Sequence, residues 1–123
     1  MKTKFKQMMV VYHNPKCRKS RAGLEYVRKH DPSATVVEYI REGISPEEVK
    51  KLISMLGIRP VELVRTQEDY YRENLKDTHP SDEEWYHILA ENPRLIRRPV
   101  VVSNGKAVIA DPPEKAGIFF NNQ

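Results

Sequence analysis

The stretch MMVVYHNPKCRKS (residues 8–20) passes from an apolar run into a polar turn and then into a helical pattern. Asn14-Pro15 ends the apolar run because proline lacks the backbone N–H that a strand ladder needs. From Arg18 onward, small and apolar residues recur at a helical spacing. The stretch therefore predicts a buried strand, a tight turn and a helix, with Cys17 where the helix begins.

Cys17 is the only cysteine of the chain and is expected at the N-terminus of that helix. The unpaired N–H groups and partial positive charge of a helix N-terminus favour a thiolate over a thiol. A hydrogen bond from the Ser20 hydroxyl and, if protonated, the charge of His13 would act in the same direction. The neighbouring cations are Lys16, Arg18 and Lys19. A lone cysteine is usually a small buried apolar residue, but these charged neighbours favour a reactive thiolate.

Length and composition favour one domain over residues 1–123, with 39% hydrophobic and 31% charged residues. The 21 basic and 17 acidic residues are interspersed, so the net charge of +4 suits anion binding but forms no stripe for nucleic acid. One cysteine excludes an intramolecular disulfide, and a reducing cytoplasm is the compatible compartment. Residues 1–7 are expected to form a flexible leader, and no run suits a secretory signal or a membrane span.

The first half of the chain predicts a βαβ unit followed by helices. A second strand is expected at Ala34–Tyr39, parallel to the first. Residues 45–92 are expected to form a helical insertion, in which Ser45 and Ser81 each begin a capping box. The helical segments of the insertion lie at residues 45–57, 60–64, 68–75 and 81–92.

The last third of the chain predicts a hairpin and a short helix. Asn104-Gly105 separates two β-branched runs at residues 100–103 and 106–110, which is a strong hairpin signal. A last short helix is expected after residues 111–114. The order is βαβ, helical insertion, ββα, and this order is the plan of an α/β thioredoxin-like fold.

The segment His13–Ser20 (HNPKCRKS) resembles the active-site loop of the glutaredoxin-dependent arsenate reductase (ArsC) family. LVRT at residues 63–66 and LIRRPVVV at residues 95–102 are similar to further segments of that family, so the resemblance covers about residues 8–114. It implies a thioredoxin-like (glutaredoxin-like) fold with a four-stranded mixed sheet, shared with Spx-type transcription regulators. It also implies that Pro99 is a cis proline that places Arg98 beside Cys17.

The predicted site joins a soft nucleophile to fixed cations. Cys17 is the expected catalytic residue, and Arg65 and Arg98 are expected to bind an oxyanion, because a guanidinium offers paired donors and stays charged. The supporting residues are His13, Asn14, Ser20 and Pro99. Arg97 neighbours Arg98 at a strand edge and is expected to point elsewhere. The remaining histidines, His30, His79 and His87, lack the spacing of metal ligands, so no metal is expected.

One segment departs from the family pattern. Where arsenate reductases of the family carry a third arginine in an Arg-Pro-x-Glu segment, this chain has Asp111-Pro112-Pro113-Glu114, or Ala110 if the alignment slips by one residue. Losing one charged contact would weaken oxyanion binding, and a carboxylate would add repulsion.

The resemblance implies a cytoplasmic arsenate reductase in which the Cys17 thiolate attacks arsenic, with glutathione as co-substrate and glutaredoxin as partner. No tightly bound cofactor, nucleic acid or membrane is implied. One alternative is a glutathione-dependent thiol reductase of the same fold, which the Asp111 departure favours. The other is an Spx-like protein that binds RNA polymerase without catalysis. Spx-type redox switching uses Cys-x-x-Cys, and Ser20 stands at the position of the second cysteine.

Overall fold

The computed structural model describes residues 8–120 and contains one mixed sheet of four strands in the order β2-β1-β3-β4. The central strand β1 (Met9–Tyr12) pairs in parallel with β2 (Thr35–Val37) and antiparallel with β3 (Val100–Ser103). The edge strand β4 (Lys106–Ile109) pairs antiparallel with β3. The four-stranded mixed sheet and the thioredoxin-like order of elements are therefore confirmed.

The hairpin between β3 and β4 follows directly from its two turn residues. Asn104 has φ 57° and Gly105 has φ 80°, both in the left-handed region that a two-residue hairpin turn requires. Glycine adopts that conformation without steric cost. The pairing of Ser103 with Lys106 then fixes the register of the two strands.

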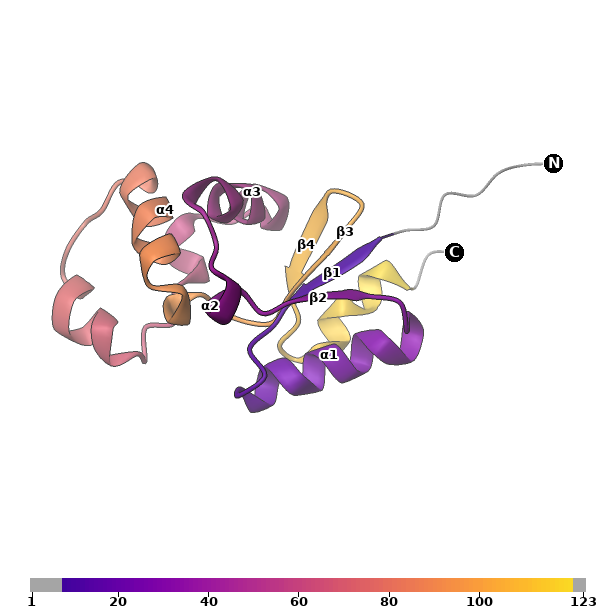
Figure 1. Cartoon of the computed structure of the whole chain (residues 1–123). Helices are drawn as coiled ribbons and strands as arrows, with labels where there is room; N and C mark the ends of the chain where they lie inside the picture. Colours follow the sequence, from indigo (N-terminus) through magenta and orange to yellow (C-terminus); the bar gives the residue numbers. More distant parts are fainter. Residues whose placement is uncertain (1–7, 121–123) are drawn as a thin grey trace.

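Helices and loops make up the rest of the described chain, and helices lie on both sides of the sheet (Figure 1). The α-helices are α1 (Arg18–His30), α2 (Tyr39–Glu42), α3 (Pro46–Leu56) and α4 (Asp82–Glu91). Shorter helical turns are η1 (Pro60–Leu63), η2 (Tyr71–Leu75), η3 (Pro93–Leu95) and η4 (Pro113–Phe119). Both expected capping boxes are present: the Ser45 hydroxyl accepts from the Glu48 N–H at 3.1 Å, and the Ser81 hydroxyl accepts from the Glu84 N–H at 3.2 Å.

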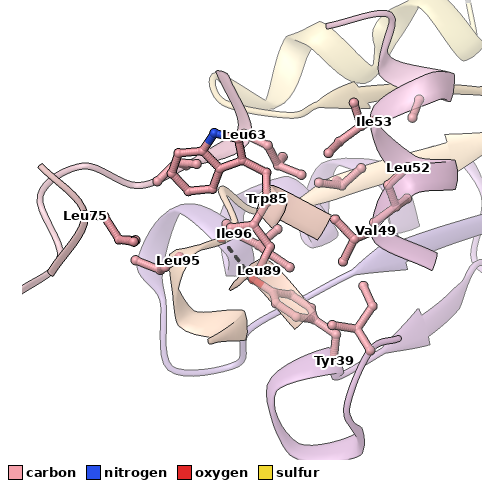
Figure 2. Packing of buried hydrophobic residues seen from close by; sticks show 14 residues of the cluster. Tyr39, Val49, Leu52, Ile53, Leu63, Leu75, Trp85, Leu89, Leu95 and Ile96 are labelled. Carbon is pink, nitrogen blue, oxygen red and sulfur yellow. Dashed lines mark hydrogen bonds between the residues drawn. The ribbon is translucent and has the colours of Figure 1, made fainter. Parts of the chain in front are cut away.

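Two apolar clusters cover the two faces of the sheet. On one face, α1 and η4 pack against β1 and β3, with Val11, Val27 and Val101 completely buried. On the other, α3, α4 and the short turns form a larger cluster that includes Tyr39, Trp85 and Leu89 (Figure 2). Phe119, near the end of the described chain, is buried in the first cluster.

The structure differs from the expected elements in two places. The strand expected at Ala34–Tyr39 is shorter, and Tyr39 instead begins α2, where its fully buried ring packs into the larger cluster. The short helix expected over residues 68–75 is a π-helix at Tyr71–Leu75. The leader expected at residues 1–7 lies outside the described residues. Over residues 8–120, no helix is both long and apolar enough to cross a membrane.

Candidate active site

The turn between β1 and α1 holds Cys17 at the N-cap position, immediately before the first residue of α1. Its backbone N–H donates to the Asn14 carbonyl at 3.0 Å, and the Asn14 side-chain oxygen accepts from the Lys16 N–H at 3.1 Å. The Arg21 guanidinium donates to the Pro15 carbonyl at 2.9 Å, which ties the turn to α1. These local bonds explain why an Asn-Pro turn suits this position, since asparagine can bond to the backbone two residues on.

Ser20 has a different role from the expected one. Its fully buried hydroxyl oxygen accepts from the Asn14 N–H at 2.9 Å and lies 2.8 Å from Nδ1 of His13. The hydroxyl therefore braces the turn, and it is the backbone N–H of Ser20 that acts on the Cys17 sulfur. Burial lowers the pKa of the His13 ring despite the opposing effect of Glu38, which disfavours the charged form of the ring.

The Cys17 thiol is biased toward its thiolate. Burial raises the pKa of the thiol, but the Ser20 N–H, the Arg98 guanidinium and the Lys19 N–H stabilise the thiolate, outweigh burial and lower the pKa. The two backbone donors are among the unpaired N–H groups of the first turn of α1. The expected effect of the helix N-terminus on Cys17 is therefore present in the geometry.

Arg98 lies between η3 and β3, far from Cys17 in sequence, and its guanidinium acts on the Cys17 thiol. The Arg98–Pro99 peptide bond is cis, as the resemblance implies. Arg98 is only 8% exposed, and its Nη1 donates to the Arg94 carbonyl at 2.7 Å and lies 3.4 Å from the Ile96 carbonyl. Within the described residues, its Nε has no hydrogen-bond partner. A buried guanidinium with a spare donor is suited to bind an anion.

Arg65 is the second expected oxyanion ligand and lies on the neighbouring segment. Its backbone N–H donates to the Leu95 carbonyl at 2.7 Å, next to the bridge between Val64 and Ile96. Its Nε donates to Glu68 at 3.1 Å, which leaves the terminal nitrogens of the guanidinium for a ligand. The sequence analysis missed Glu68, although its spacing of three residues from Arg65 is that of a local ion pair.

A cleft of about 330 Å³ brings the predicted arginines together. Its lining includes Arg65, Arg98 and also Arg97, whose guanidinium donates to the Glu62 carbonyl at 3.3 Å. This bond directs the Arg97 guanidinium toward Glu62, and its expected orientation away from Cys17 stays a prediction.

Asp111 lies at the same cleft, where the family pattern has a cation. Its carboxylate pairs with the Lys19 ammonium of α1 at 3.2 Å, and both side chains line the cleft. Because Lys19 is 64% exposed, the pair contributes little stability, about 0.2–1 kcal/mol. The expected repulsion toward an anion is therefore partly balanced by a cation that the sequence analysis did not connect with Asp111.

Comparison with known proteins identifies the family of the chain. The ArsC family model matches residues 12–119. YfgD of Escherichia coli is 39% identical over 107 residues, covering 85% of this chain and 90% of that protein. An arsenate reductase of Neisseria meningitidis is 32% identical over 106 residues, covering 85% of this chain and 91% of that protein. The structure of an arsenate reductase from Vibrio cholerae has a TM-score of 0.83 at 40% identity, covering 89% of this chain and 94% of that one. With a matching family model, relatives of similar length and the cysteine turn in place, this chain belongs to the ArsC family.

Proposed function

We propose that this chain is an arsenate reductase that uses Cys17 as its nucleophile and draws its electrons from glutathione and glutaredoxin. The observation that carries the proposal is the Cys17 sulfur at the N-terminus of α1, faced by the buried guanidinium of Arg98. A lowered thiol pKa supplies the nucleophile. Arg98, which lines the cleft, supplies guanidinium donors for the oxygens of a bound anion.

The proposed reaction transfers two electrons from two thiols to arsenic. The Cys17 thiolate attacks As(V) and displaces one arsenate oxygen as water, which forms a sulfur–arsenic bond. The thiol of glutathione then attacks the Cys17 sulfur, arsenite leaves with the electron pair of the broken bond, and a mixed disulfide remains. Glutaredoxin reduces that disulfide and restores the Cys17 thiol. Arg65 and Arg98 hold the oxygens through these steps.

The test is arsenite formation from arsenate in the presence of glutathione and glutaredoxin. We expect turnover with the unmodified chain and none with Cys17→Ser. We expect Arg98→Lys to lose roughly 10- to 100-fold in kcat/KM, since the ammonium lacks the planar fork of the guanidinium. Arg59→Lys is the matched control, because Arg59 is exposed and outside the cleft. Absence of turnover with the unmodified chain would refute the arsenate assignment.

A second candidate is a glutathione-dependent thiol reductase, which the carboxylate of Asp111 in the cleft favours. The sulfur atoms of a mixed disulfide carry no charge and need no cations to bind them, so the missing arginine matters less for this reaction. The test is reduction of a mixed disulfide between glutathione and a small thiol. Activity in this assay, together with no arsenite formation and dependence on Cys17, would select the second candidate.

A further inference from the structure

Tyr39 carries a hydroxyl group deep inside the molecule, behind the proposed site. The side chain is fully buried, and its hydroxyl donates to the Ile96 carbonyl at 3.2 Å (Figure 2). The proposed reaction gives this hydroxyl no role. Packing alone does not require it, because phenylalanine would fill the same volume.

The Ile96 carbonyl is shared between Tyr39 and Arg98. Nη1 of Arg98 lies 3.4 Å from this oxygen and donates more closely, at 2.7 Å, to the Arg94 carbonyl. Both carbonyls belong to the turn that contains η3, which is held by the bond from the Ile96 N–H to the Pro93 carbonyl at 3.0 Å. The guanidinium is thus fixed against a turn whose Ile96 carbonyl also accepts from Tyr39.

The groups that act on the Tyr39 hydroxyl include residues of the candidate site. Burial raises the pKa of Tyr39 to about 12, and the Arg98 guanidinium, through charge and hydrogen bonding, is the main group that opposes this rise. The charges of Arg65 and Cys17 also act on the hydroxyl. The printed geometry agrees for Arg98, because the Tyr39 hydroxyl and Nη1 of Arg98 both donate to the Ile96 carbonyl.

We propose that Tyr39 is a positioning residue whose hydroxyl, bonded to the Ile96 carbonyl, holds the Arg98 guanidinium against the Cys17 sulfur. Without the Tyr39 hydroxyl, the Ile96 carbonyl has one donor fewer and accepts more strongly from Nη1 of Arg98. This stronger bond draws the Arg98 guanidinium away from the Cys17 sulfur. The guanidinium then spends less time at the sulfur, and the thiolate loses stabilisation. The inference rests on the proposed role of Cys17 as a thiolate but not on the identity of the substrate.

The experiment measures ionisation of the thiol directly. Because Cys17 is the only cysteine, the rate of iodoacetamide alkylation against pH reports its pKa without interference from other thiols. We expect Tyr39→Phe to lower the ionisation constant of the thiol by roughly three- to tenfold, the range for weakening one charge-assisted hydrogen bond. Circular dichroism and thermal melts establish that each variant is folded.

Tyr12→Phe is the matched control. The Tyr12 ring packs against that of Tyr39 with centroids 6.4 Å apart, but its hydroxyl donates to Glu48 at 3.4 Å and not to the turn around Ile96. We expect alkylation of this variant to match the unmodified chain. An equal change in Tyr12→Phe would show that the effect comes from core packing, and it would overturn the proposal.

A double substitution tests whether Tyr39 acts through Arg98. In an Arg98→Met background, Tyr39→Phe should leave the thiol pKa unchanged, because no guanidinium remains to be positioned. Arg98→Lys provides a second background, in which the additional effect should be small. An undiminished effect in both backgrounds, or no effect of Tyr39→Phe in the unmodified chain, would overturn the inference. A thiol pKa that is not lowered in the unmodified chain would refute both the proposed function and this inference.

Discussion

Gly23 lies in α1 at the place where the helix rests on Pro99. A Cβ atom built on Gly23 would lie 2.4 Å from Cγ of Pro99 and 3.2 Å from the Ala110 carbonyl oxygen. Neither neighbour can move away easily. Cγ belongs to the closed Pro99 ring, and the hydrogen bond from the Ala110 N–H to the Pro99 carbonyl, at 2.9 Å, holds the two residues together. Gly23→Ala therefore forces α1 away from the segment that carries Arg98.

Two opposing effects decide the sign of the stability change. Alanine in place of a helical glycine stabilises by about 1 kcal/mol. Forcing an extra methyl group into a packed interior costs about 1–3 kcal/mol, and a contact as short as 2.4 Å belongs at the upper end. We therefore expect a net loss of about 1–2 kcal/mol. With an unfolding entropy of about 2.1 cal/mol/K per residue over 123 residues, this loss lowers Tm by roughly 4–8 °C.

Thermal unfolding followed by circular dichroism measures this change. Ala22→Gly, at the preceding and only partly buried position of α1, gives the propensity effect alone, a decrease of about 4 °C. The displaced Arg98 should also slow alkylation of Cys17 at neutral pH. A Tm raised by about 4 °C in Gly23→Ala would mean that the methyl group fits, and it would refute the inferred contact between α1 and the Pro99 ring.

Three further predictions concern the candidate site. Ser20→Ala should destabilise by about 1–3 kcal/mol in urea unfolding, because two buried bonds of the turn are lost, whereas the exposed Ser33→Ala should change stability by less than about 0.5 kcal/mol. The folded state lowers the pKa of Cys17, so the stability of the unmodified chain relative to Cys17→Ser should be highest above the usual thiol pKa. This difference should fall as the pH drops through the lowered pKa of the folded state. A difference that rises as the pH drops would contradict a thiolate at Cys17. Asp111→Asn should tighten arsenate or phosphate binding about two- to fivefold by calorimetry, and Glu114→Gln, outside the cleft, should not.

Local patterns predicted most of the fold but misplaced Tyr39. The capping boxes, the Asn-Gly turn and the start of α1 depend on residues within a few positions of one another, so the sequence reveals them directly. Tyr39 follows a β-branched run and was therefore assigned to a strand. Its actual position depends on a hydrogen bond to Ile96, 57 residues away, and on the larger apolar cluster. No local pattern contains that information.

The candidate site was predicted unevenly for a similar reason. The resemblance located Cys17, Arg65 and Arg98, and the Arg98 guanidinium is one of the groups that lower the pKa of the Cys17 thiol. The Ser20 hydroxyl contacts two partners that the sequence analysis did not foresee, the Asn14 N–H and the His13 ring. Proximity in sequence shows which groups can reach a sulfur atom, but competition among partners decides which of them do.

The charge of the cleft shows why Asp111 weakens the arsenate assignment without removing it. In the described part of the chain, Lys19, Arg65, Arg97 and Arg98 line the cleft together with the Asp111 carboxylate, which is paired with Lys19. The lining therefore remains positive, and it attracts both arsenate and the carboxylates of glutathione. Net charge does not separate the two proposed reactions. The separation depends on whether the donors beside Cys17 bind the oxygens of an anion, and arsenite formation measured against disulfide reduction in the same preparation decides that question.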